Sequence, residues 1–255
     1  MNPLLDPDAR TIIAHRGASG LAPENTLEAF ERAVREGAGA FELDVRLSRD
    51  GAPVVMHDAT LDRTTDRSGP VRAQALADLR SADAGYRFTP DRGRTFPFRA
   101  KGVRVPTLGE VLWTFPRMPM LIEIKEPEVQ AAVLRVLVTE SATERCVVAS
   151  ERGEALDLVR ESPVARAASG DEITALYRSS LLWLPLPRAT YRLLSVPARH
   201  RMLPVPTVRF ISAARRLGCP VHVWTINDAA IARALWARGV AGIVTDYPGL
   251  IGKVR

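Results

Sequence analysis

The sequence predicts an α/β fold in which helices alternate with the strands of a parallel sheet. Short apolar runs typical of buried strands alternate with longer segments of helical period over most of the chain. Polar and charged residues follow several of these runs, at the strand ends where a barrel places its functional groups. A chain of 255 residues suits one large domain of this class. These patterns alone allow either a barrel or a doubly wound open sheet.

The first expected strand covers residues 11–14 and presents His15 and Arg16 at its carboxyl end. Its residues are apolar or β-branched, as buried strands prefer. A helix should follow Pro23, because apolar residues then recur with the helical period, and it should stop at Gly37. Strand, helix and strand in this order form the basic unit of a parallel sheet.

The second expected strand, residues 40–47, carries two carboxylates on one face. Glu42 and Asp44 are separated by one residue, and alternate residues of a strand point the same way. Two half-buried carboxylates repel each other unless a cation lies between them. This pair therefore indicates a cation site.

A short antiparallel strand is expected directly after the second strand. Asp50-Gly51 is a tight-turn dipeptide, and residues 53–56 form another apolar run that ends at His57. A parallel crossover needs far more residues than this, so we expect a hairpin. Pairing about the turn would join residues whose numbers sum to about 101, which sets Asp44 opposite His57.

The rest of the chain indicates loops and further helix–strand units. Residues 60–69 predict a polar loop, 74–79 a short helix, and 81–106 a long loop of the kind that is usually functional or a lid. Thr107 and Glu110 have the spacing of a helix capping box. Strands are expected at 121–125, 145–150, 164–168, 221–225 and 241–245, and helices at 128–140, 151–161, 207–217 and 228–238.

Nine short motifs follow one another along the chain: HRG at 15–17, PENT at 23–26, ELDV at 42–45, DGAPVVMHD at 50–58, LDRTT at 61–65, PTLGEVL at 106–112, EIK at 123–125, VWTIN at 223–227 and GIVTDYP at 242–248. In content and order they resemble the glycerophosphodiester phosphodiesterase family, within the phospholipase-C-like phosphodiesterases. The resemblance covers nearly the whole chain and is weakest over 171–204. It implies a (β/α)8 TIM barrel formed by a single domain over 1–255. It also implies a short insertion at about 81–106, after the second strand and hairpin, that covers the site.

Three carboxylates at expected strand ends are the candidate metal ligands. Glu123, in the strand at 121–125, joins Glu42 and Asp44. Oxygen ligands without cysteine or clustered histidine favour Mg²⁺ or Ca²⁺ over zinc. A lone acid on such a strand is more often a salt-bridge partner, but the resemblance implies the metal role for all three.

His15 and His57 are the candidate catalytic residues. Phosphodiester cleavage needs one group that takes a proton from the nucleophile and one that gives a proton to the leaving oxygen, and imidazole does either near neutral pH. Arg16 and Lys125 would bind the phosphoryl oxygens of the substrate. Lys125 also suits a plain ion pair with the carboxylate two residues before it. Trp224 suits either a pocket wall against the glycerol or a place in the core.

Four further polar residues are kept outside the expected site. Glu24 and Asn25 lie just before a helix, where such residues commonly cap the first turn. Asp58 follows His57, but in a hairpin it would point to the opposite face. Asp246 follows the last expected strand, where a barrel places functional residues, but it also suits a structural role.

Together with the resemblance, these residues predict a metal-dependent hydrolase that cleaves glycerophosphodiesters to glycerol 3-phosphate and an alcohol by histidine acid/base catalysis. The attacking group is either water or the substrate's own neighbouring hydroxyl, which would first give a cyclic phosphate. One alternative is hydrolysis of lysophospholipids at a membrane surface, as a lysophospholipase D. The other is a barrel that binds phosphodiesters without cleaving them.

Composition and charge restrict the classes of partner and the location that are expected for the protein. The net charge of +6 suits anionic substrates or a membrane surface, while the spread of arginines and the lack of a nucleic-acid motif argue against nucleic acid. The N-terminal residues lack a secretory signal and no apolar run reaches about 18 residues, so a cytoplasmic protein is expected. Cys146 and Cys219 should be reduced and buried. The apolar, basic segment at about 178–194 is either a buried helix and loop or a peripheral membrane contact.

Overall fold

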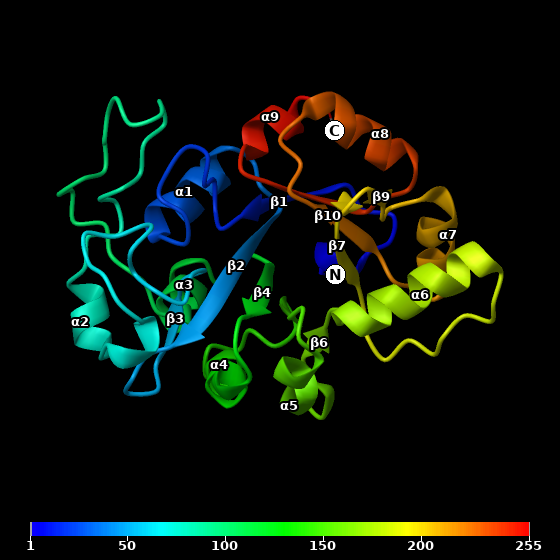
Figure 1. The fold of residues 1–255 in the computed structure, drawn as a ribbon, viewed down its shortest axis with the longest axis horizontal. Coiled ribbons are helices and arrows are strands. Elements are labelled where there is room, and N and C mark those ends of the chain that lie inside the picture. Colours follow the sequence, from blue (N-terminus) through cyan, green and yellow to red (C-terminus); the bar gives the residue numbers. More distant parts are fainter. Residues whose placement is uncertain (1, 255) are drawn as a thin grey trace.

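Eight parallel strands form the centre of the fold in residues 2–254, which the computed structural model describes (Figure 1). They are β1 (Thr11–His15), β2 (Ala40–Leu47), β4 (Met120–Ile124), β5 (Cys146–Ala149), β6 (Ala165–Arg166), β7 (Leu194–Pro197), β10 (Val221–Trp224) and β11 (Gly242–Thr245). The strands neighbour one another in chain order, and β11 pairs back onto β1. A single parallel bridge between Ala167 and Leu193 joins the β6 and β7 ends of the sheet. This closure confirms the predicted (β/α)8 barrel.

In residues 2–254 a short additional helix, α2 (Leu76–Arg80), follows the hairpin after β2. Apart from α2, one helix comes between each barrel strand and the next, and one follows the last strand. In that order they are α1 (Leu27–Arg35), α3 (Leu108–Thr114), α4 (Gln130–Thr139), α5 (Asp157–Arg160), α6 (Gly170–Leu182), α7 (Val208–Arg216), α8 (Ala229–Ala237) and α9 (Pro248–Gly252). Two clusters of buried apolar residues lie between the strands and these helices. A third cluster fills the barrel itself, where Leu4 from the N-terminal 3-10 helix is fully buried against Ile13 and Val244.

The alternation of side chains along β2 sets the position of the carboxylates. Phe41, Leu43 and Val45 are fully buried in the layer between sheet and helices. Glu42 and Asp44 alternate with them and therefore point into the barrel, on the face they were predicted to share. The outward face is fixed by aromatic packing, because the Phe41 ring lies 4.9 Å from Phe30 and 5.1 Å from Phe115, centroid to centroid.

The predicted hairpin is present, but its register differs by one residue from the prediction. β3 (Pro53–Val55) runs antiparallel to β2 and pairs Val45 with Val55. The N–H of Met56 donates to the carbonyl oxygen of Asp44 at 2.9 Å, so Met56 and not His57 lies opposite Asp44. The N–H of Ser48 donates to the carbonyl oxygen of Ala52 at 2.9 Å, so the loop holds three residues where a turn about Asp50-Gly51 would hold two, and loop length fixes the pairing of a hairpin.

Residues 81–106 contain neither helix nor strand, as predicted, and follow the short helix α2 (Leu76–Arg80). The segment packs largely on itself. The guanidinium of Arg99 lies 3.8 Å from the ring centroid of Phe96 and 4.2 Å from that of Tyr86, and Phe88 packs edge-on against Phe98. In Figure 1 this segment forms the loops beyond α1, on the opposite side of the barrel from α6.

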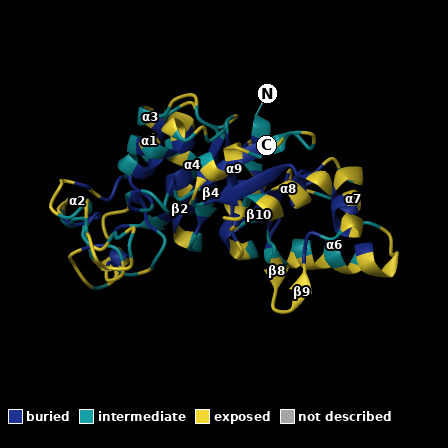
Figure 2. Cartoon of the chain, turned by 90° about the horizontal axis from the view of Figure 1, so that it is seen from above, coloured by how far each residue is buried: buried dark blue, intermediate teal, exposed yellow. Residues whose placement is uncertain are grey.

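Residues 171–204, where the resemblance is weakest, contain most of α6 and a small hairpin. A capping box of Ser169 and Glu172 starts α6, and Arg166, only 3 % exposed, pairs with Glu172 at 2.7 Å. After an extended segment and β7, the strands β8 (Arg199–His200) and β9 (Leu203–Pro204) pair in an antiparallel hairpin that projects from the body of the barrel (Figure 2). Two predicted elements before α6 are shorter than expected, since β6 has two residues and α5 four.

Both cysteines are free and buried, as predicted, and burial raises the pKa of Cys146 to about 12. None of the helices found in residues 2–254 combines the length and the apolar character needed to cross a bilayer.

Candidate active site

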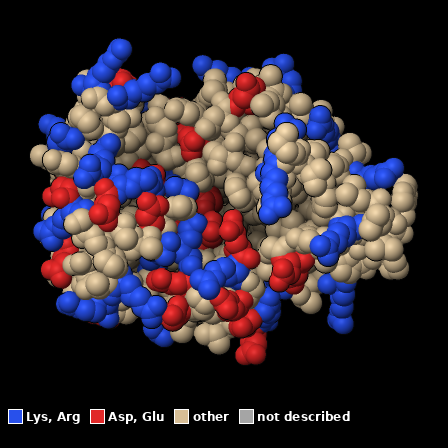
Figure 3. All heavy atoms as spheres, viewed as in Figure 1, with Lys and Arg blue, Asp and Glu red and all other residues tan. Residues whose placement is uncertain are grey.

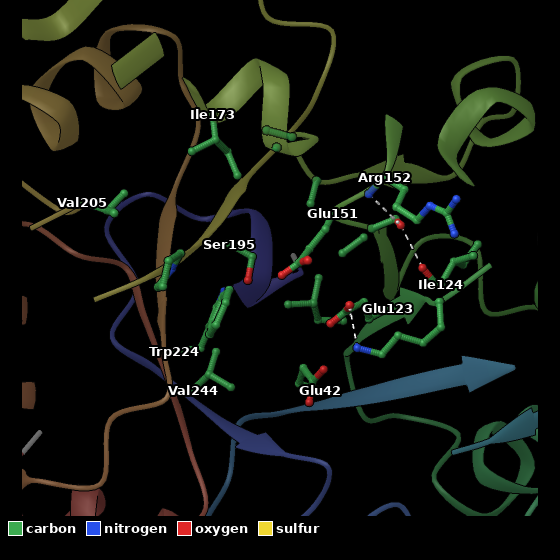
Figure 4. A pocket seen from close by; sticks show the side chains of 18 of the residues that line it. Glu42, Glu123, Ile124, Glu151, Arg152, Ile173, Ser195, Val205, Trp224 and Val244 are labelled. Atoms are coloured by element: carbon green, nitrogen blue, oxygen red, sulfur yellow. Dashed lines mark hydrogen bonds and ion pairs between the residues drawn. The ribbon is translucent and has the colours of Figure 1, made fainter. Parts of the chain in front are cut away.

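A cavity of about 860 Å³ opens at the carboxyl end of the barrel (Figure 4). One half is polar and contains Glu42, Glu123 and Lys125 together with both predicted catalytic histidines. The other half is more apolar, and Ile173 and Val205 lie there, away from Glu42 and Glu123 in Figure 4. The carboxyl ends of parallel strands meet at one end of a barrel, so side chains that are distant in sequence gather here.

Strand register brings the three carboxylates together. Asp44 of β2 lies directly opposite Glu123 of β4, and Glu42 lies opposite His15 of β1. One oxygen from each of Glu42, Asp44 and Glu123 can be chosen so that all lie within 4.8 Å of one another. The predicted convergence of these carboxylates is therefore present.

Two cations approach the same carboxylates. Lys125 Nζ lies 2.8 Å from Asp44 Oδ1 and 2.7 Å from Glu123 Oε1, so the ion pair considered from the sequence is present. Arg16 places Nε 3.1 Å from Asp44 Oδ2, and its backbone N–H donates to Glu42 Oε2 at 3.0 Å. This close approach needs the glycine that follows, since Gly17 has φ +81° and a Cβ there would lie 2.7 Å from Ala29.

Positive charge is shared unequally among the carboxylates. Burial favours the neutral form of Asp44, but Lys125 and Arg16 outweigh it and hold its pKa below the usual value. Burial, with repulsion from Asp44, raises the pKa of Glu42 to about 8. The same two causes raise the pKa of Glu123 despite Lys125.

The set thus has three buried or half-buried carboxylates for two cations, with no histidine or cysteine among the candidate ligands. A hard divalent cation such as Mg²⁺ or Ca²⁺ fits both this charge deficit and this choice of donor atoms.

His15 is held by Asp246, a residue that the sequence reasoning left outside the site. His15 Nδ1 lies 2.7 Å from Asp246 Oδ1, which also accepts from the hydroxyl of Ser19 at 2.8 Å. Burial lowers the pKa of His15, but the bond to Asp246 and the charge of Glu42 more than compensate, and the net pKa is raised. The signal available in the sequence was the position of Asp246 directly after the last strand.

His57 is held by its chain neighbour, and the expectation that Asp58 points away was wrong. His57 Nδ1 lies 2.6 Å from Asp58 Oδ1, because β3 ends at Val55 and strand alternation no longer applies at His57. Arg63 donates from Nε to Asp58 Oδ2 at 2.6 Å and reaches Glu24 with its other nitrogens at 2.7 Å. Arginine therefore orients the aspartate that orients His57.

The capping role expected for Glu24 and Asn25 belongs instead to Thr26, whose hydroxyl accepts from Ala29 N–H. Asn25 is 3 % exposed and donates from Nδ2 to Asp44 Oδ2 at 2.9 Å. Glu24 accepts from Arg16 at 3.0 Å as well as from Arg63. Asn25 therefore holds Asp44 in place, and Glu24 holds Arg16 and Arg63.

The segment at 178–194 divides between the two expected alternatives. Tyr191, Leu193 and Leu194 are buried in the core, whereas Leu182 and Trp183 are 65 % and 81 % exposed. The end of α6 therefore lies at the surface and the strand that follows lies inside.

Comparisons with known proteins show the family and the fold of this chain. Residues 15–250 match the model of the glycerophosphoryl diester phosphodiesterase family. A glycerophosphodiester phosphodiesterase of Bacillus subtilis is 32 % identical over 99 % of this chain and 88 % of its own.

Among solved structures, a phosphodiesterase of Oleispira antarctica in complex with the product sn-glycerol-3-phosphate is 29 % identical. Its TM-score is 0.77, with 96 % of each chain covered. The glycerophosphoryl diester phosphodiesterase domain of an uncharacterized protein from Mycobacterium tuberculosis has a TM-score of 0.87 at 22 % identity. It covers 96 % of this chain and 98 % of its own, and it supports the fold. The chain belongs to the glycerophosphodiester phosphodiesterase family, whose members are phosphoric diester hydrolases.

Proposed function

We propose that this chain hydrolyses glycerophosphodiesters to glycerol 3-phosphate and an alcohol, with His15 and His57 as the catalytic acid and base. One observation carries the proposal: three carboxylate oxygens lie within 4.8 Å of one another in a cavity lined by two histidines, each bonded to an aspartate. The glycerol phosphate product bound to the Oleispira relative supports this choice of substrate.

Glu42, Asp44 and Glu123 would hold a divalent cation, Mg²⁺ or Ca²⁺. When bound, such an ion supplies Lewis acidity toward a phosphoryl oxygen and lowers the pKa of a coordinated hydroxyl.

Each histidine has one ring nitrogen committed and one free. An ionised aspartate only accepts, so His15 donates from Nδ1 to Asp246 and His57 donates from Nδ1 to Asp58. Nε2 of each ring is then the atom that exchanges a proton. One imidazole takes a proton from the nucleophile and the other gives one to the leaving oxygen.

Arg16 and Lys125 would bind the phosphoryl oxygens. Both line the cavity, and burial opposes their charge less than the neighbouring carboxylates favour it, so the pKa of each is raised. Two fixed positive charges in a partly water-excluded site stabilise charge that develops on the phosphoryl group. Trp224 would form the wall against which the glycerol lies.

We also propose that residues 81–106 are an insertion of a single-domain barrel that covers one side of the site. Phe88, Thr89 and Pro90 line a second cavity of about 370 Å³, together with His15 and Asp246. His15 lines both cavities, so the insertion would shield the imidazole from solvent.

Lysophospholipids are a second candidate substrate class, which the apolar half of the large cavity favours. Ile173, Tyr177, Leu203 and Val205 line this half. An acyl chain would bury the apolar surface of these side chains, whereas a small headgroup would leave most of it uncovered. Cleavage would then be of the lysophospholipase D type.

A substrate panel with and without chelator tests the proposal. We expect turnover of glycerophosphocholine and glycerophosphoethanolamine with Mg²⁺ or Ca²⁺ and none after chelation. His15→Ala or His57→Ala should lower kcat by about 100-fold or more, the scale of a lost acid or base. His200→Ala is the matched control, because His200 lines the same cavity from the β8–β9 hairpin. Absence of turnover with Mg²⁺, Ca²⁺ and Mn²⁺ alike would support a binding protein instead.

A further inference from the structure

We propose that the chain docks on an anionic phospholipid bilayer through an apolar, arginine-rich surface beside the mouth of the cavity. This surface, here called the docking face, consists of Leu182, Trp183 and Leu184 at the end of α6, Met202 and Leu203 in the β8–β9 hairpin, and the exposed arginines 178, 188, 192, 199, 201 and 209. The proposal concerns binding and stands or falls independently of the hydrolytic activity.

Large apolar side chains are unusually exposed in this region. Trp183 is 81 % and Met202 82 % exposed, while Leu182, Leu203 and Leu184 range from 65 % to 51 %. The two parts of the docking face are tied together, since the hydroxyl of Tyr177 in α6 donates to the carbonyl of Pro204 at 3.1 Å. Figure 2 shows the hairpin and α6 side by side, with the hairpin and the end of α6 coloured as exposed. Apolar groups gathered at a surface in this way mark a contact with something else.

The charge of this region is entirely positive. Residues 173–227 contain eight arginines and neither aspartate nor glutamate. Among the described residues 2–254, none of the six arginines of the docking face has a carboxylate within ion-pair distance. In Figure 3 the side of α6 and α7 shows blue side chains among tan atoms, whereas red ones gather mostly elsewhere. A bilayer of anionic lipids has the complementary charge.

Two residues of the docking face have a backbone conformation that their side chains disfavour. Trp183 caps α6 with φ 57°, and Arg201 occupies the hairpin turn with φ 54°. Glycine or asparagine adopts this left-handed conformation at the least cost, and a bulky side chain there is strained. Packing compensates little for this strain at Trp183, because its ring is exposed and contacts the guanidinium of Arg209, 4.9 Å from the ring centroid. These two residues fit a contact outside the chain better than they fit their turns.

A bilayer suits this surface better than a protein does. Tryptophan, leucine and methionine side chains insert at the boundary of headgroups and acyl chains, while arginines bind the lipid phosphates around them. A second copy of this chain would bring the same arginines face to face in a twofold contact, and like charges oppose such a dimer. The hairpin protrudes from the body of the barrel, as a segment that inserts into a bilayer would (Figure 2).

The docking face adjoins the cavity. His200 and Leu203 of the hairpin and Tyr177 of α6 line the apolar half of the cavity. Leu203 is 59 % exposed, so it belongs both to the surface and to the cavity wall. Docking would therefore turn the cavity mouth toward the lipid, where amphiphilic phosphodiesters are concentrated.

Vesicle sedimentation of the full chain tests the proposal without any measurement of turnover. We expect binding to vesicles in which about a third of the phosphatidylcholine is replaced by phosphatidylglycerol, and release at about 0.5 M salt, where surface charges are screened. Arg199→Gln with Arg201→Gln should weaken binding by about 25-fold, from roughly fivefold for each arginine. Trp183→Ser with Met202→Ser should weaken it by about tenfold or more.

Trp113→Ser and Arg117→Gln are the matched controls. Trp113 on α3 is 75 % exposed, and both residues lie outside the docking face. Circular dichroism and the thermal midpoint would establish that each variant is folded.

Four results would overturn the proposal, and the first three come from the vesicle experiment. They are absence of binding to both vesicle types, equal binding to pure phosphatidylcholine, or equal loss in the control variants. A fourth is a dimer, seen by sedimentation velocity, that the docking-face substitutions dissociate while vesicles remain unbound.

Discussion

Replacing Asp246 by asparagine should invert the tautomer of His15 while leaving the shape of the site unchanged. The orientation of the new amide follows from its neighbours. Asn227 Oδ1 accepts from the hydroxyl of Thr245 and from the N–H of residue 246, both at 2.9 Å, so its Nδ2 must face residue 246. That Nδ2 donates to Asp246 Oδ2 at 2.6 Å. The asparagine oxygen would take this position, and its NH2 group would face His15 Nδ1.

An NH2 group at Nδ1 makes that nitrogen an acceptor and moves the ring proton to Nε2. If His15 acts as the base, its neutral ring would then have no free lone pair on Nε2 to accept a proton. If His15 acts as the acid, its protonated ring would lose the stabilising charge of Asp246. We therefore expect kcat/KM to fall by about 10² to 10⁴-fold, or about 3 to 5 kcal/mol of transition-state stabilisation. KM should change little, because Asp246 does not line the large cavity that would bind the substrate.

The assay is steady-state hydrolysis of glycerophosphocholine over a range of pH. Asp228→Asn is the matched control, since Asp228 caps α8 and makes no contact with His15. If Asp246→Asn retained kcat/KM within about threefold of the parent, an orienting role for Asp246 would be refuted.

Three further substitutions test the fold and the support of the site. His222 is fully buried, and burial lowers its pKa from 6.5 to about 4. Between these pH values His222 is protonated in the unfolded chain but not in the folded one. The free energy of unfolding should therefore fall by up to about 3 kcal/mol as the pH drops from 6.5 to 4. Urea unfolding at pH 7 and pH 4.5 should show a smaller loss in His222→Leu, and an unchanged loss would contradict the assignment. Phe41→Ala should lower the free energy of unfolding by about 3 to 5 kcal/mol, because Phe41 is fully buried between two phenylalanine rings; a loss below about 1 kcal/mol in urea would contradict that packing. Arg63→Met should lower kcat about tenfold by freeing Asp58, with KM nearly constant, and a pure KM effect would place Arg63 in substrate binding instead.

Local patterns predicted the parts of the structure that local forces determine. The second strand runs over Ala40–Leu47 as predicted, because apolar and carboxylate residues alternate along it. The capping box of Thr107 and Glu110 is present for the same kind of reason, since its bonds join residues three apart. The side-chain alternation of β2 correctly placed Glu42 and Asp44 on one face.

The remaining contacts depend on tertiary closure, which a local pattern does not encode. His15 and Asp246 meet only because β11 pairs with β1, 231 residues away in sequence. Asp58 was misassigned because strand alternation was carried three residues past the end of β3 at Val55. The exposure of Trp183 depends on where α6 ends relative to α7, and a run of apolar residues does not distinguish a surface helix end from a buried one.

Calorimetric titration of Mg²⁺ and Ca²⁺ into the metal-free protein tests the central claim most directly. We expect one divalent site per chain, which is lost or weakened at least about tenfold in each of Glu42→Gln, Asp44→Asn and Glu123→Gln. Glu151→Gln, a cavity residue outside the three-carboxylate set, should retain the site. Parent-like affinity in Glu42→Gln and Glu123→Gln, or no binding by the parent, would contradict it.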